Sequence, residues 1–383
     1  MDPRRGRSPS LLMQLLLPPR ILFGRGALAQ AMPHLRALGD RLILVHSASA
    51  SAALPLADDL RALGCTVHTY IAKGEPTLPG LEAALKTLRP HNAGAVIALG
   101  GGSALDLGKA LAALLPGTHP PLYHLEVVGD GHSLDTAPLP FAAIPTTSGT
   151  GAEATKNAVI SVPDAQRKVS LRDDRMIACL AVVDPALTED VPPAIRLASG
   201  LDAITQVIEP YLSRNATPLT DALCRDAIPL GLRALRSLMH TPTEQAFGDM
   251  AHVSLSGGIA LANAGLGAVH GLAGVLGGRT GAPHGALCGR LLVPVVRTNL
   301  ARMRGPRGPE VLSWIAAAFP EAPDPLSALE AWIDAQGLPR LADLGVTPDT
   351  HGDVATESLA ASSMRPNPVQ LSVSDLLQIL ASS

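Results

Sequence analysis

Short apolar runs alternate with helix-length segments along the first half of the chain. Four of these runs have the length and composition of buried strands: 41–45, 66–71, 93–99 and 141–144. The segments between them, such as 52–63 and 78–88, are rich in alanine and leucine and predict helices. Because parallel strands need a long crossover between them, this alternation predicts an α/β fold with a parallel sheet.

The pattern changes after Asp184, where strand-like runs fade. The long segments 193–213, 219–239 and 246–277 predict helices instead. We therefore expect an α/β domain over residues 1–190 and an all-helical domain over residues 191–383. Since ligands collect between domains and at the carboxyl ends of parallel strands, we expect the functional site in the cleft between the two domains.

Composition narrows the class of protein. With 383 residues, of which 47% are hydrophobic, the chain can bury a large core, and no apolar run approaches the roughly 20 residues that span a bilayer. A formal charge of -3 and an aromatic content of 2% predict no nucleic-acid partner. The stretch 11–17 is too short for a secretion signal. We therefore expect an irregular N-terminal tail followed by a strand. We expect a soluble, cytoplasmic protein.

The four cysteines are far apart and form no C-x-x-C pair. This spacing is typical of reduced thiols rather than of a disulfide framework. None of them is predicted to act as a nucleophile: Cys65, Cys179, Cys224 and Cys288.

A glycine bend follows the apolar run 93–99. Gly100, Gly101, Gly102 and Ser103 stand between this run and a helix-like segment. Glycines let the backbone approach a ligand closely, and the N–H groups that open a helix attract anions, so the bend suits a pyrophosphate. A strand-to-helix turn also uses glycine for steric reasons alone, and that explanation stays open here.

Four polar residues of the second half have the donor atoms of a metal site. Asp202 and Gln206 stand four apart and would project from one helix face, while His270 and His284 lie in two later glycine-rich segments. A carboxylate with two imidazoles suits a divalent transition metal such as Fe or Zn, and such an ion could polarise an alcohol or carbonyl oxygen. A structural role for the histidines is the alternative.

Five motifs that occur in order resemble the iron-containing, group III alcohol dehydrogenase family. They are GGGSALDLGKA (100–110), IPTTSGTGAEAT (144–155), VDPALT (183–188), GLDAITQVIE (200–209) and HGLAGVLGG with APHG (270–278 and 282–285). The resemblance implies a Rossmann-like domain that holds NAD(P) and an all-α domain that holds a metal, in a dehydroquinate synthase-like fold. It further implies hydride transfer between the cofactor and a small alcohol or aldehyde, in a homodimer.

The resemblance also assigns roles to single residues. Cofactor contacts are expected from Gly101, Gly102, Ser103, Asp106, Thr146, Thr147 and Lys168. Metal contacts are expected from Asp202, Gln206, His270 and His284, of which Asp202, His270 and His284 would be catalytic. A capped turn is the alternative for the two threonines, and a solvated surface charge is the alternative for Lys168.

Two positions depart from the family pattern in the metal site. The family usually has histidine four residues after the metal-binding aspartate, where this chain has Gln206. An amide oxygen is a poorer donor to Fe or Zn than an imidazole, so a lower metal affinity is expected. A second histidine usually follows four residues after the one matching His270, where this chain has Gly274. Water, the cofactor ribose or another side chain would then move the proton.

A third departure concerns the cofactor. Dehydrogenases that prefer NAD often place an acidic residue after a strand in the position of 41–45 to bind the ribose, whereas this chain has His46 and Ser47. Ser47 is expected beside the cofactor. Since no carboxylate would repel a 2'-phosphate, we expect NADPH or dual use.

Three other functions compete with this one. Maleylacetate reductases, a related branch, are regarded as working without metal and would need cationic partners for a dicarboxylate, for which Arg279 and Arg290 are candidates. A lyase resembling dehydroquinate synthase would need several basic residues around a phosphate, and few lie near the histidines. An inactive homologue that retains cofactor binding is the third.

Overall fold

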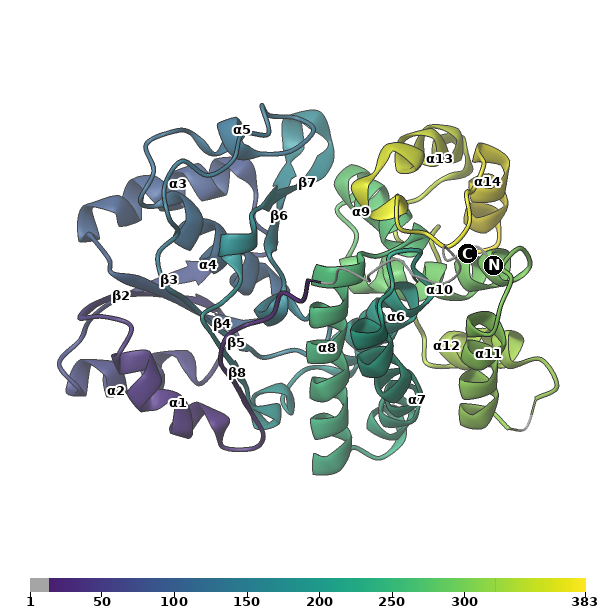
Figure 1. Cartoon of the computed structure of the whole chain (residues 1–383), viewed down its shortest axis with the longest axis horizontal. Helices are drawn as coiled ribbons and strands as arrows, with labels where there is room; N and C mark the ends of the chain where they lie inside the picture. Colours follow the sequence, from purple (N-terminus) through teal and green to yellow (C-terminus); the bar gives the residue numbers. More distant parts are fainter. Residues whose placement is uncertain (1–13, 321) are drawn as a thin grey trace, which may run out of the picture.

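The computed structural model describes residues 14–320 and 322–383, which form a sheet lobe and a helical lobe (Figure 1). The sheet lobe holds six parallel strands in the order β1-β8-β5-β4-β2-β3. Their bounds are β1 Ile21–Phe23, β2 Arg41–Ser47, β3 Thr66–Ala72, β4 Ala95–Gly100, β5 Phe141–Pro145 and β8 Leu180–Val183. The parallel sheet predicted from the apolar runs is confirmed.

Helices cover both faces of the sheet. Their bounds are α1 Ala27–Arg36, α2 Ala53–Ala62, α3 Leu78–Leu88, α4 Gly102–Leu114 and α5 Pro121–His124. Along β2, Leu42 and Leu44 pack with α1 and α2, while Ile43 and Val45 pack with α3 and α4. Successive side chains of a strand point to opposite faces, so a strand that is apolar throughout is buried on both sides.

An antiparallel hairpin lies outside the main sheet and was missed by the sequence analysis. Its strands are β6 Asn157–Val162 and β7 Arg167–Arg172, and the short strand β8 was missed as well. Both hairpin strands are fully buried only at alternate positions, so their signal is weaker than that of the continuous apolar runs. The first strand, β1, is the one expected after the N-terminal tail, of which residues 1–13 lie outside the described residues.

The helical lobe follows the last strand. Its helices are α6 Pro193–Leu212, α7 Pro218–His240, α8 Glu244–Ala264, α9 Ala268–Thr280, α10 His284–Leu300, α11 Arg307–Ala318, α12 Pro325–Ala335, α13 His351–Ala360 and α14 Val373–Ala381. Within residues 184–320 and 322–383 no strand is found, so the all-helical second half is confirmed. The proposed domain limit at residue 190 falls between Val183, which ends the sheet, and Pro193, which begins α6.

Short 3-10 turns connect several of these elements. They cover Arg89–His91, Ala152–Ala154, Pro163–Ala165, Asp174–Met176, Pro185–Thr188, Pro348–Thr350 and Ser362–Met364.

The segment 246–277, which the sequence predicts to be helical, forms two helices rather than one. Gly265 ends α8 with a φ of 72°, a left-handed conformation that glycine adopts without strain, and α9 starts three residues later. The two axes differ by 98°. In the described part of the chain, no single helix has the length and apolar character of a membrane span. Of the described helices, only α8 and α9 taken together have that length and character, and they are bent relative to each other. The bend directs the first turn of α9 toward α6.

Glycines allow the two lobes to pack closely. A methyl group on Gly258 of α8 would lie 2.2 Å from the carbonyl oxygen of Gly151, and one on Gly278 of α9 would lie 2.9 Å from the carbonyl oxygen of Gln166 beside β7. The loop after β5 therefore rests against α8, and the hairpin rests against α9 (Figure 1).

Candidate active site

The glycine bend joins the ends of three neighbouring strands. The backbone N–H of Gly101 donates to Oγ of Ser47 over 3.3 Å, and the N–H of Thr146 donates to the carbonyl oxygen of Gly100 over 2.9 Å. Ser47 ends β2, Gly100 ends β4 and Thr146 follows β5. The bend therefore lies at the carboxyl ends of the strands, the edge where α/β sheets bind ligands.

Packing inside the protein requires two of the three glycines. A methyl group on Gly100 would fall 2.2 Å from Oγ of Ser47, and one on Gly102 would fall 2.8 Å from a methyl group of Thr150. A methyl group on Gly101 would lie 3.4 Å from Thr147, which is an ordinary van der Waals distance. The steric explanation thus covers Gly100 and Gly102 and does not extend to Gly101.

The helix α4 begins directly at the bend. No side chain caps its first turn, which includes Ser103, and backbone N–H groups at such a helix start attract anions. Asp106 lies one turn further on, and its Oδ2 accepts a hydrogen bond of 3.1 Å from the N–H of Val159. Burial raises the pKa of Asp106 to about 6. Asp106 therefore also ties α4 to the hairpin.

A buried lysine that the sequence analysis did not single out lies behind the bend. The ammonium of Lys109 donates to the carbonyl oxygens of Ala152 and Asn157 and to Oγ1 of Thr155, at 2.7, 3.0 and 2.7 Å. Burial lowers the pKa of Lys109 to about 8 and raises the pKa of the neighbouring Glu153 to about 7. Lys109 therefore fixes the segment 152–157, which follows the loop of Thr146 and Thr147, against α4.

Lys168 lies on β7, between the hairpin and α9. Its ammonium forms an ion pair with Glu75, and a methyl group on Gly277 would lie 2.9 Å from Nζ. Only 7% of the Lys168 side chain is exposed. A solvated surface charge is therefore the wrong description of this residue.

Four donor side chains from three helices converge in the helical lobe. Asp202 comes from α6, His270 from the first turn of α9, and His284 and Cys288 from α10. One ligand atom of each lies within 4.8 Å of the others. The structure thus brings together three of the predicted metal ligands and adds a thiol.

The distances within the cluster match those of a shared cation. Oδ1 of Asp202 lies 3.3 Å from Nε2 of His270 and 3.9 Å from Nε2 of His284. The same oxygen is buried and makes no hydrogen bond. A carboxylate oxygen that faces two imidazole nitrogens without a partner of its own is a donor set for a divalent transition metal. The residues present therefore fit the metal that the resemblance implies.

The cluster favours positive charge. Burial alone would lower the pKa of His284, but the charges of Cys288 and Asp202 outweigh it and raise the pKa to about 9. Burial is likewise outweighed at His270, where Cys288 and Glu209 hold the pKa well above its ordinary value. Burial opposes ionisation of Asp202, yet the two imidazoles lower its pKa. Protons and a metal ion therefore compete for the same nitrogens.

Cys288 and Glu209 are the residues of this site that the sequence analysis missed. Cys288 stands four residues after His284, on the same face of α10, and its Sγ lies 3.5 Å from Nε2 of that histidine. Glu209 stands seven residues after Asp202, and its Oε2 lies 2.6 Å from Nδ1 of His270. Spacings of four and seven residues place side chains on one face of a helix. These spacings are the sequence signals that could have identified Cys288 and Glu209. Glu209 orients the His270 ring so that Nε2 faces Asp202.

The two departures from the family pattern lie beside the cluster. Gln206 is buried one turn after Asp202, and its amide nitrogen donates to the carbonyl oxygen of Gly149 over 2.7 Å. This bond links the metal-site helix to the loop after β5. A methyl group on Gly274 would meet nothing within 4 Å, so the position has room for a side chain.

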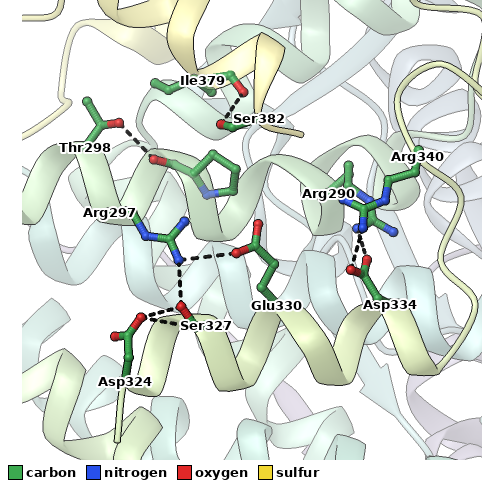
Figure 2. Close-up of polar contacts among 11 residues, drawn as sticks. Arg290, Arg297, Thr298, Asp324, Ser327, Glu330, Asp334, Arg340, Ile379 and Ser382 are labelled. Atoms are coloured by element: carbon green, nitrogen blue, oxygen red, sulfur yellow. Dashed lines mark hydrogen bonds and ion pairs between the residues drawn. The ribbon is translucent and has the colours of Figure 1, made fainter.

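The two arginines considered for a dicarboxylate are engaged elsewhere. Arg279 forms an ion pair with Glu357 over 2.6 Å. Arg290 pairs with Asp334 and donates to the carbonyl oxygen of Pro339 over 3.1 Å. Figure 2 shows Arg290 and Arg340 both directed at Asp334. Both arginines therefore hold pairs of helices together. The maleylacetate reductase interpretation is left without the two cations that were candidates to bind a dicarboxylate.

Comparisons with known proteins agree with this architecture. Residues 18–185 match the family described as iron-containing alcohol dehydrogenase, and residues 196–383 match the C-terminal part of the same family. Long-chain-alcohol dehydrogenase 1 of Geobacillus thermodenitrificans is 39% identical over 71% of this chain and 70% of its own length. Alcohol dehydrogenase 4 of Saccharomyces cerevisiae is 31% identical over 95% of this chain and 96% of its own length.

Solved structures give the same result. A 1,3-propanediol oxidoreductase superposes with a TM-score of 0.85 at 28% identity and covers 97% of this chain and 99% of its own. Sulfoacetaldehyde reductase from Bifidobacterium kashiwanohense, solved in complex with NAD+, gives a TM-score of 0.83 at 25% identity over 97% and 98% of the two chains.

A parallel-sheet lobe joined to a helical lobe with a buried metal-donor cluster defines a two-lobed alcohol and aldehyde oxidoreductase. The chain belongs to the iron-containing alcohol dehydrogenase family.

Proposed function

We propose that this protein transfers a hydride reversibly between NAD(P) and a small alcohol or its aldehyde or ketone. The observation that carries the proposal is the orphaned oxygen of Asp202, which faces the imidazoles of His270 and His284. The His284 side chain is 32% exposed, whereas that of Asp202 is 3% exposed. The cluster is therefore accessible from the His284 side, where a substrate oxygen would enter.

The cofactor is proposed to lie along the glycine bend. Gly101 and Gly102 with Ser103 would hold the pyrophosphate at the start of α4, and Ser47, Asp106, Thr146 and Thr147 would surround it. In support, the bend lies at the carboxyl ends of β2, β4 and β5, the edge where α/β sheets bind ligands. Lys168 would bind the cofactor phosphates only if its ion pair with Glu75 were broken.

A groove beyond β2 supports a preference for NADPH or dual use. It is lined by His46, Ser51, Thr69, Ile71 and Lys73 among others, and none of the described residues that line it carries a carboxylate. A 2'-phosphate would meet the ammonium of Lys73 there without repulsion. We expect Lys73→Ala to weaken NADPH binding about tenfold and to leave NADH binding nearly unchanged.

The chemistry divides between metal and protein. A bound divalent metal supplies Lewis acidity that polarises the substrate oxygen. Asp202, His270 and His284 would hold that metal, and Glu209 keeps the His270 ring in place. Gly274 has no side chain that could transfer a proton. Water or the cofactor ribose would carry the proton instead.

Metal analysis combined with NADPH absorbance tests the proposal. Purified protein should contain divalent metal, oxidise NADPH with small aldehydes, and lose this activity after chelation. Activity that survives complete metal removal would favour the maleylacetate reductase alternative. Cofactor binding without turnover on any aldehyde would favour an inactive homologue, and turnover of a sugar phosphate without net change in NADPH would favour a lyase.

Two further expectations concern the oligomeric state and the limit between the domains. A homodimer is proposed from the family resemblance, and light scattering of the purified protein tests it. The division at residue 190 is proposed as the limit between cofactor domain and metal domain.

A further inference from the structure

We propose that the thiolate of Cys288 is the fourth protein ligand of the metal at Asp202, His270 and His284, and that it makes this site prefer zinc or cobalt to ferrous iron. The inference rests on the proposed function, because it concerns the same metal centre.

The geometry of the cluster places the thiol at ligand distance from its neighbours. Donors bound to one zinc ion at about 2.0–2.3 Å stand roughly 3.3–3.8 Å apart in a tetrahedron. Sγ of Cys288 lies 3.5 Å from Nε2 of His284, and the pairs formed by Asp202 with the two histidines measure 3.3 and 3.9 Å. Small side-chain adjustments would bring all four atoms onto one ion.

The register of α10 explains why Cys288 reaches the ion. His284 and Cys288 are one helical turn apart, so their side chains stack on the same face. Cys288 is fully buried, and its thiol makes a hydrogen-bond contact with a member of the cluster, Nε2 of His284. In contrast, the thiols of Cys65 and Cys179 donate to the carbonyl oxygens of Gly39 and Phe141.

Gln206 is the other candidate for the fourth ligand, as the sequence predicts. Its amide nitrogen is committed to the carbonyl oxygen of Gly149. A neutral amide oxygen is also a weaker donor to a transition metal than a thiolate. Donor strength therefore favours Cys288 over Gln206 in place of the family's missing imidazole.

The choice of donor changes the choice of metal. Thiolate is a soft ligand that suits zinc and cobalt, and the thiol releases its proton to solvent when the metal binds. With Asp202, His270, His284 and Cys288 as protein ligands, a substrate oxygen would be a fifth ligand, which zinc accepts during catalysis.

Cobalt spectroscopy tests the proposal directly. Metal-free protein is titrated with Co²⁺, and the native protein should show a near-ultraviolet thiolate-to-cobalt charge-transfer band together with visible cobalt bands. Cys288→Ser should lose the charge-transfer band and should bind Zn²⁺ about 100-fold more weakly. Cys224→Ser is the matched control, because Cys224 is also fully buried on a helix of the same lobe but lies outside the cluster. The control should keep both properties.

Competition between Zn²⁺ and Fe²⁺ tests the selectivity. The native protein should bind Zn²⁺ at least about tenfold better relative to Fe²⁺ than Cys288→His does, because the histidine restores a harder donor set. Equal ratios in the two proteins would overturn the selectivity.

X-ray absorption of the native zinc protein keeps the test independent of how the variants fold. One sulfur at about 2.3 Å from zinc is expected, and a spectrum with only nitrogen and oxygen ligands would overturn the proposal. Cobalt bound without a charge-transfer band, or a band that persists in Cys288→Ser, would also overturn it. In those cases the cobalt protein would still oxidise NADPH with aldehydes, so the proposed function would survive. Failure to bind any metal would contradict both the Cys288 proposal and the proposed metal-assisted function.

Discussion

Glu209 holds His270 in position, with 2.6 Å between its Oε2 and Nδ1 of the imidazole. The other oxygen of Glu209 accepts a hydrogen bond of 2.7 Å from the N–H of Val269. One carboxylate therefore fixes both the first turn of α9 and the ring that it carries. This arrangement depends on the bend at Gly265, because a straight continuation of α8 would direct His270 elsewhere.

Replacing this carboxylate should weaken the metal site. Glu209→Gln is expected to lower Zn²⁺ affinity about 10–100-fold, because the amide orients the imidazole less firmly and makes it less basic. The measurement is competition with a chromophoric chelator. Helical content by circular dichroism should stay unchanged, and an unaltered zinc affinity would show that Glu209 serves only the backbone of α9.

Removing one imidazole should separate metal binding from cofactor binding. His284→Ala is expected to remove the metal and most activity and to leave NADPH affinity within about twofold, because the two sites lie in different lobes. Metal content and NADPH fluorescence titration check the two halves of this expectation. Full turnover in the variant would rule out the metal mechanism.

The bend offers a test that distinguishes ligand approach from packing. Gly101→Ala should keep the melting temperature and weaken NADPH binding at least about tenfold, because the new methyl group has room inside the protein but occupies the position proposed for the pyrophosphate. Gly102→Ala is the contrast, since its methyl group would clash with Thr150 and should lower the melting temperature. If Gly101→Ala binds NADPH normally, the cofactor does not lie along the bend.

The buried Glu153 should make stability depend on pH. Burial raises its pKa to about 7, above the 4.5 of an ordinary glutamate, so the native state binds the proton more tightly than the unfolded state. The stability from this group is full below pH 4.5 and is lost as the pH rises through about 7.

Glu153→Gln should remove this dependence. The variant mimics the protonated form, so its free energy of unfolding should exceed that of the native protein at pH 8 by up to about 3 kcal/mol and should match it near pH 4.5. Urea unfolding at several pH values measures the difference. The exposed Glu82→Gln is the control and should show no such trend. A constant difference across the pH range would contradict the buried ionisation.

Local patterns in the sequence determined the central strands and helices of the sheet lobe, although not its hairpin or β8. The apolar run at 93–99 and the amphipathic segment at 78–88 became β4 and α3 because continuous burial and helical periodicity are properties of neighbouring residues. The resemblance of five motifs identified the family, and it pointed to Asp202, His270 and His284 although they lie up to 82 residues apart, from 202 to 284.

Only the tertiary structure decided how distant side chains meet. That Cys288 joins the metal donors, that Glu209 supports His270, and that Arg290 is held by Asp334 all depend on how α6, α9, α10 and α12 cross. Helix crossings are set by packing over the whole lobe rather than by local periodicity. A spacing of four residues can place Cys288 on the face of His284, but it cannot tell which residues that face will meet.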